Sequence, residues 1–114
     1  MSITEVTLDS FESFVSKPGI AFLDCWAEWC PPCRAFKPVF EAAATQNPEI
    51  AFGSLNTQQE QVLASELEIT SIPTIMAFRD GILVYREPGA MPAKGFAQLI
   101  QAVQDLDMAK IQAS

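Results

Sequence analysis

The chain has 114 residues, a length that suits one compact domain over residues 1–114, because two separate cores would each be too small. Hydrophobic residues make up 49% of it and charged residues 18%, which excludes a disordered tail or an acidic linker. Fourteen acidic and seven basic residues give a net charge of −7, so a nucleic-acid-binding surface is not expected. The sequence has no histidine, so acid–base chemistry at neutral pH must use other side chains.

The number of cysteines and the sequence of the N-terminus indicate the cellular compartment in which the protein is expected. Three cysteines are an odd number and too few for a secreted scaffold held by disulfides. The segment from Met1 to Thr7 has no basic start followed by an apolar run, so no signal peptide is expected. No apolar stretch approaches the length of a membrane span. We therefore expect a soluble cytoplasmic protein, and nothing in the sequence calls for an obligate oligomer.

The N-terminal region predicts a short helix followed by a buried strand. An edge strand near Thr4–Thr7 comes first. Asp9 and Glu12 have the spacing of a capping box, which would open a helix that ends near Lys17. Ile20–Trp26 is then an almost uninterrupted apolar run, typical of a strand covered on both faces.

The middle of the chain predicts a helix, a strand and a second helix. The first helix has an apolar stripe at helical spacing, formed by Phe36, Val39, Phe40 and Ala43. Pro38 lies inside this pattern and should kink the helix. Ile50–Leu55 favours a second central strand. Thr57 and Glu60 form another capping box, which would open a helix through Leu67.

The C-terminal region predicts a hairpin and a long helix. Asp80-Gly81 joins the strands Thr74–Phe78 and Ile82–Arg86 and is a strong hairpin signal. The final helix is marked by Phe96, Leu99, Ile100, Val103 and Leu106. The alternation of strands and helices up to the hairpin predicts an α/β fold whose parallel sheet has one antiparallel edge strand.

A pair of cysteines separated by two residues lies where the first buried strand gives way to a helix. The segment reads Trp29-Cys30-Pro31-Pro32-Cys33. At the helix N-terminus, free N–H groups and the macrodipole favour a thiolate on Cys30, while Cys33, one turn later, would be shielded. This asymmetry suggests that Cys30 attacks the disulfide of a partner and that Cys33 resolves the mixed disulfide. The prolines are tolerated because first-turn N–H groups lack intrahelical partners.

Two other interpretations of these cysteines are a zinc half-site and a pair of inert thiols. Zinc needs about four ligands, and with no histidine and only Cys25 besides the pair, no metal site is expected. Inert thiols are expected within an element, not at its N-terminus. Cys25 itself, inside the buried strand, is interpreted as a small hydrophobic residue. No cofactor is expected.

The segment from Asp24 to Cys33 resembles the active-site segment of thioredoxins, in which glycine usually stands at the place of Pro31. Ile72-Pro73-Thr74 is similar to the cis-proline loop of that family, and Pro38 matches its helix-kinking proline. Gly89-Ala90, followed by Lys94-Gly95, resembles the start of the last helix. The resemblance covers nearly the whole chain. It implies a thioredoxin fold, with a central mixed sheet of four to five strands flanked by helices on both faces.

Asp24 stands in the middle of an apolar strand, where burial should raise its pKa. It could then take the proton of Cys33 and return it, the role that the resemblance implies for the matching aspartate. The alternative is a buried acid that is hydrogen-bonded for structural reasons alone. Ser54 replaces a lysine that thioredoxins often carry near this acid, so Asp24 should be more neutral at rest.

The resemblance also implies a surface for extended or unfolded protein segments. A cis peptide bond before Pro73 would expose the backbone of Ile72 for pairing with a substrate strand. The expected rim is neutral and partly apolar, although some of its members should pack inside. It consists of Trp29, Pro31, Pro32, Ile72, Pro73, Thr74, Gly89, Ala90 and Met91. Trp26 is expected in the core.

The sequence thus favours a protein-disulfide reductase that cycles a Cys30–Cys33 dithiol and disulfide. Its expected partners are disulfide-containing proteins and an electron donor of the thioredoxin-reductase type, which implies roles in electron transport and cell redox homeostasis. The segment Asn56-Thr57-Gln58 lacks an acid that is common in the family, which bears on recognition by that reductase. An oxidase or isomerase of the same fold and a non-catalytic binding module are the alternatives.

Overall fold

The computed structural model describes residues 3–113, which form a five-stranded sheet with helices on both faces. The strands are β1 (Ile3–Glu5), β2 (Ile20–Trp26), β3 (Ala51–Asn56), β4 (Thr74–Arg79) and β5 (Ile82–Pro88). The helices are α1 (Phe11–Val15), α2 (Pro31–Gln46), α3 (Gln61–Glu66), α4 (Ala93–Gln104) and α5 (Met108–Ala113). No helix in this part of the chain is both long and apolar enough to cross a membrane.

The strand order is β1-β3-β2-β4-β5, with β2 at the centre. Strands β1, β3 and β2 are parallel, whereas β4 is antiparallel to β2 and β5 is antiparallel to β4. The prediction of one antiparallel edge strand was therefore wrong, because the reversed strand is β4, next to the centre. A helix of six residues such as α3 rises only about 9 Å, less than the ~20 Å of a six-residue strand. The chain therefore enters β4 at the end of the sheet where β3 finishes.

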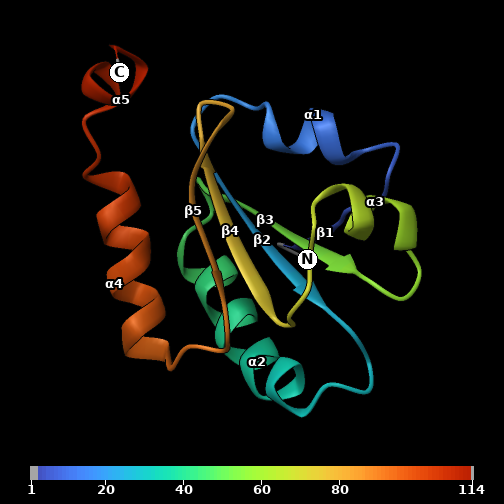
Figure 1. The fold of residues 1–114 in the computed structure, drawn as a ribbon. Helices are drawn as coiled ribbons and strands as arrows, with labels where there is room; N and C mark the ends of the chain where they lie inside the picture. Colours follow the sequence, from blue (N-terminus) through green and yellow to red (C-terminus); the bar gives the residue numbers. More distant parts are fainter. Residues whose placement is uncertain (1–2, 114) are drawn as a thin grey trace.

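Two apolar clusters lie on opposite faces of the sheet, as the arrangement of the helices in Figure 1 indicates. One cluster joins the sheet to α2 and α4 through Phe22, Phe36, Phe40, Phe52, Phe96 and Ile100. The other joins it to α1 and α3 through Val6, Phe14, Leu23, Leu55 and Leu63. Successive residues of β2 serve the two clusters in turn, which explains why its sequence is apolar except at Asp24.

The predicted hairpin is confirmed. Asp80 and Gly81 both have positive φ angles, 53° and 82°, as the two central residues of a tight type I′ turn require. The turn is tied to the residue before β2, because Asp80 N–H donates to the carbonyl of Gly19 and the carboxylate of Asp80 accepts from Gly19 N–H, both at 2.8 Å. Gly19 also has a positive φ angle, 91°.

Neither predicted capping box forms. The N-cap of α1 is Ser10 rather than Asp9, and it makes no side-chain cap bond. Before α3, Thr57 Oγ1 donates to the carbonyl of Trp26, and Glu60, the N-cap itself, accepts at Oε1 from the N–H of Leu8. At α3, contacts distant in sequence therefore engage the side chains that the local pattern assigned to the start of the helix.

The C-terminal end of α4 is held by Arg79 of β4. One guanidinium nitrogen of Arg79 donates to the carbonyl oxygens of Val103, Gln104 and Leu106 at 2.8–3.1 Å. The carbonyl of Val103 also accepts from Leu106 N–H at 3.4 Å. A guanidinium supplies both further donors and the positive charge that suits a helix C-terminus. The short helix α5, which the sequence did not predict, follows this point.

Replacement of Gly53 in β3 should destabilise the fold. A β-carbon at this position would lie 2.6 Å from the ring of Phe14 and 2.7 Å from Val6. We expect Gly53→Ala to lower the free energy of unfolding by about 1–3 kcal/mol in urea titrations. The matched control is Gly95→Ala in α4, where the nearest atom is 3.6 Å away, and which should stabilise by about 0.5–1 kcal/mol. Equal effects of the two substitutions would contradict this account of α1 packing.

Candidate active site

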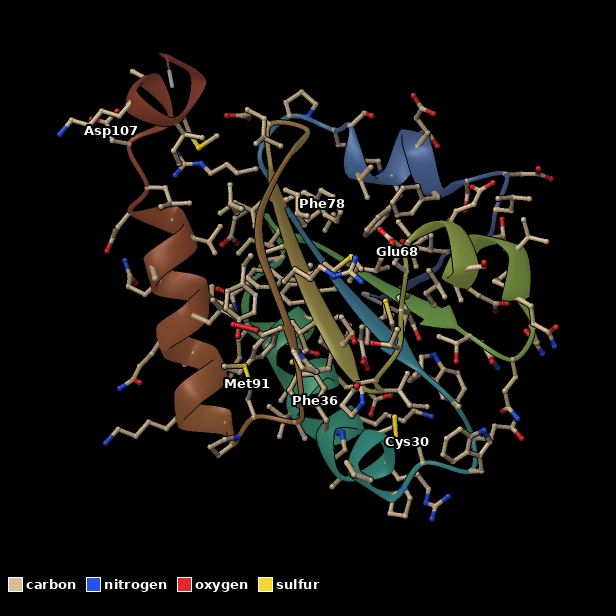
Figure 2. The ribbon with its side chains drawn as sticks, viewed as in Figure 1. Cys30, Phe36, Glu68, Phe78, Met91 and Asp107 are labelled. Carbon is tan, nitrogen blue, oxygen red and sulfur yellow. A yellow bond between two sulfur atoms is a disulfide. The ribbon has the colours of Figure 1, made fainter. Side chains whose placement is uncertain are left out.

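Cys30 is the N-cap residue of α2, and its extended backbone leads the chain from β2 into the helix. Figure 2 shows it at the end of α2 that lies beyond β2. Pro31 and Pro32 occupy the first helical positions, so the first N–H of the helix that can reach Cys30 is that of Cys33. This N–H donates to Cys30 Sγ at 3.2 Å. The helix terminus thus directs a backbone dipole at the sulfur atom, as the sequence predicted.

Cys30 and Cys33 form a disulfide, with their α-carbons 5.2 Å apart. This distance lies within the range that a disulfide requires. The exposed fraction is 2% for Cys30 and 4% for Cys33, so the expected shielding of Cys33 alone does not describe this oxidised form. The two residues differ instead in position, because Cys30 caps the helix and Cys33 lies in its first turn.

The segment before β4 covers Cys30. The Ile72–Pro73 peptide bond is cis, as the resemblance implied, and the carbonyl oxygen of Ile72 lies 3.7 Å from Cys30 Sγ. Gly89 donates its N–H to the carbonyl of Pro73 at 2.7 Å. The hydroxyl of Thr74 donates to the carbonyl of Ser71. These bonds fix the loop against the hairpin and against the cysteine pair.

The predicted rim is only partly at the surface. Trp29 is 65% exposed, and the side chains of Pro31, Pro32 and Ala90 are exposed as well, as is Gly89. Ile72 is half-buried and packs against the cysteine pair. The other members of the rim are less exposed. Pro73 and Thr74 are buried, and Met91 packs against the apolar cluster that joins the sheet to α2 and α4.

Asp24 lies in the middle of β2, with Ser54 beside it on β3 and Ile75 beside it on β4. It is 5% exposed, and its Oδ1 atom has no hydrogen-bond partner among the described residues. Burial raises the pKa of Asp24 from its usual value of 3.8 to about 7. The group can therefore exchange a proton near neutral pH, which histidine would otherwise do.

Asp24 and Cys33 line the same open pocket, whose volume is about 600 Å³. Trp26 also lines it, and its indole nitrogen is buried without a partner in the described part of the chain. Lys37, Asn56 and Gln59 are among the lining residues that the sequence analysis did not assign to the site. Lys37 follows Cys33 by four residues, and this helical spacing is the signal that could have identified it.

Cys25 points to the opposite face of the sheet from Asp24 and belongs to the cluster under α1 and α3. It is fully buried and is not part of a disulfide. Burial, with a smaller effect from the nearby Asp24, raises the pKa of its thiol to about 12, so a thiolate does not form there at neutral pH. Across residues 3–113, no three potential metal ligands of the Cys, Asp and Glu types come together.

Comparison with known proteins agrees with this geometry. The chain matches the Thioredoxin family over residues 2–102. The candidate thioredoxin 2 of Streptomyces coelicolor is 38% identical over 111 residues, which cover 97% of this chain and 83% of that protein. A thioredoxin of Porphyra purpurea is 39% identical over 94 residues, covering 81% and 88%. The oxidised mitochondrial thioredoxin 3 of Saccharomyces cerevisiae superposes with a TM-score of 0.77 at 28% identity, covering 92% and 96%.

A bridged cysteine pair at the start of a helix on this fold defines a thiol-disulfide oxidoreductase. The family match covers far more than half of the chain, and the Streptomyces relative covers nearly all of it. The chain belongs to the thioredoxin family, and it is a protein-disulfide reductase.

Replacement of Pro31 by glycine should make the protein a weaker reductant. Glycine adds an N–H to the first turn of α2, which increases the positive end of the helix dipole near Cys30 and stabilises the thiolate. A more stable reduced form raises the reduction potential, by on the order of 10 mV. Equilibration of wild type and Pro31→Gly with glutathione buffers measures the difference. A lower potential in the glycine variant would contradict the argument.

Asp24→Asn should change how the stability of the oxidised protein depends on pH. Because burial raises the pKa of Asp24 to about 7, the folded protein holds a proton that the unfolded chain has lost between pH 4 and pH 7. The free energy of unfolding of wild type therefore falls as the pH rises through this window. Asparagine does not titrate, so the variant should exceed wild type by up to about 4 kcal/mol at pH 8. Urea titrations at pH 4 and pH 8 test this, and an equal difference at both would refute it.

Proposed function

We propose that Cys30 is the attacking cysteine of the reductase. In the reduced protein its thiolate attacks one sulfur of a client disulfide, so that a Cys30–client bond forms, the client S–S bond breaks and a client thiolate leaves. Support comes from the helix N-terminus, which directs the Cys33 N–H at Cys30 Sγ. Further support comes from the place of Cys30 beside the carbonyl of Ile72, at the border of the exposed surface.

Cys33 then resolves this mixed disulfide. Its thiol transfers a proton to the Asp24 carboxylate, and the resulting thiolate attacks Cys30 Sγ. The Cys30–Cys33 bond forms, the Cys30–client bond breaks, and the second client sulfur leaves as a thiolate. The client gains two electrons, and the protein loses two. The proton on Asp24 passes to solvent or to the released thiolate. The pKa of Asp24, raised by burial to about 7, supports this role because both of its protonation states are accessible at neutral pH.

The clients are extended, disulfide-containing protein segments. Trp29, Pro31, Pro32 and Ala90 offer an exposed, uncharged and partly apolar surface around the cysteines, and the cis peptide at Pro73 orients the Ile72 backbone toward it. An electron donor of the thioredoxin-reductase type restores the dithiol, which assigns the protein to electron transport and cell redox homeostasis. We place it in the cytoplasm as one thioredoxin-like domain over residues 1–114, since the buried thiol of Cys25 suits a reducing compartment.

One observation carries the proposal: Cys30 at the N-cap of α2 is bonded to Cys33 in its first turn, and Cys33 lines a pocket together with the buried Asp24, whose Oδ1 atom has no partner among the described residues. This combination provides an attacking sulfur, a resolving sulfur and a proton acceptor.

The roles of the two cysteines are tested with a trapping variant. Cys33→Ser should attack clients but be unable to release them, so mixed disulfides on Cys30 should accumulate and disappear on addition of dithiothreitol. Cys30→Ser should give no such adducts. Both variants should lose reduction of insulin disulfides almost completely, whereas the matched control Cys25→Ala should keep it. Adducts on Cys33 in the Cys30→Ser variant would reverse the assignment.

A further inference from the structure

One face of α2 carries Cys33, Lys37 and Glu41, spaced by four residues and therefore stacked one turn apart. All three line the pocket that contains Asp24. Cys33 is buried, whereas Lys37 and Glu41 are exposed. Lys37 is thus the first charged residue along the helix face that starts at the resolving cysteine.

The sheet supplies no cation to Asp24. Its neighbours on the adjacent strands are Ser54 on β3 and Ile75 on β4, and neither carries a charge. Its Oδ1 atom has no partner among the described residues, although 95% of the residue is buried. An unpartnered carboxylate is costly in such a place, so a cation must approach from α2 or the adjoining loop if the ionised form is to be populated.

The charged and titratable groups around this pocket leave one candidate. The acids are Glu5 on β1, Glu28 before α2 and Glu41 on α2, and Cys33 is the only other titratable group; the bases are Arg34 and Lys37. Arg34 Nη1 donates to the carbonyl of Glu28 at 2.6 Å, so its guanidinium is already engaged by the exposed loop before α2. Lys37 forms no hydrogen bond or ion pair within residues 3–113.

We propose that Lys37 is a positioning residue of the reductase, whose ammonium extends along the pocket wall and stabilises the Asp24 carboxylate that receives the Cys33 proton. The flexible four-carbon stem of lysine allows this reach, and the burial of Asp24 strengthens the attraction between the two charges at the carboxylate end. The inference rests on the proposed role of Asp24. Lys37 acts through that carboxyl group and is not itself a catalytic residue.

The direct test follows the titration of Asp24 in the oxidised protein by carboxyl ¹³C NMR. Lys37→Gln should move the midpoint upward by about half a pH unit or more, and Lys37→Arg should restore it toward the wild-type value. The matched control is Lys17→Gln, which removes the same charge at an exposed residue outside this pocket and should leave the midpoint unchanged. An equal shift in Lys37→Gln and Lys17→Gln, or no shift in either, would overturn the proposal.

Kinetics provide the second readout. Release of a client from the mixed disulfide should be about two- to threefold slower in Lys37→Gln at pH 7, with the difference lost above pH 9 where Asp24 is ionised in both proteins. In an Asp24→Asn background, Lys37→Gln should have no further effect. A pH-independent loss of rate would contradict action through Asp24. The titration needs no turnover, so it can fail while the cysteine trap succeeds, which separates this inference from the proposed function.

Discussion

At the first turn of α2, Pro31 and Pro32 have no N–H, so Cys30 Sγ accepts its hydrogen bond from the N–H of Cys33. The rest of the site is arranged around this contact. It holds the two cysteines one turn apart. The buried strand β2 fixes where the turn begins, because its apolar residues are held on both faces of the sheet. The cis bond at Pro73 then places the Ile72 carbonyl over the outer sulfur. A change at any of these points alters the surroundings of Cys30.

Much of the fold could be predicted from local patterns, and the errors have physical causes. The bounds of β2 were predicted correctly, because a strand buried on both faces is apolar at nearly every position, with Asp24 the exception here. Most other strand ends shifted by one or two residues. The capping box predicted before α1 was wrong because that helix begins one residue later, with Ser10 as its N-cap. The one predicted before α3 was wrong because Thr57 and Glu60 bond to Trp26 and Leu8, which are 31 and 52 residues away. A pattern over four residues contains no information about such partners.

The part of the site formed by residues adjacent in the sequence could be predicted. The part formed by residues that only the fold brings together could be predicted less well. The order of the cysteines and prolines indicated redox chemistry, and the apolar surroundings of Asp24 predicted the direction of its pKa shift. The burial of Cys30 depends on the loop before β4, more than 40 residues later, and was not foreseen. Lys37 could be placed near Asp24 only once the pocket between α2 and the sheet was visible.

The bond from Arg79 to the end of α4 has a practical consequence for protein production. Its three acceptors include Leu106, which lies beyond the last residue of that helix. A chain shortened just after Gln104 would keep the helix but give up one acceptor, and β4 would be less firmly attached at the end remote from Pro73. Affinity tags and fusion partners are therefore better joined after α5 than directly to α4.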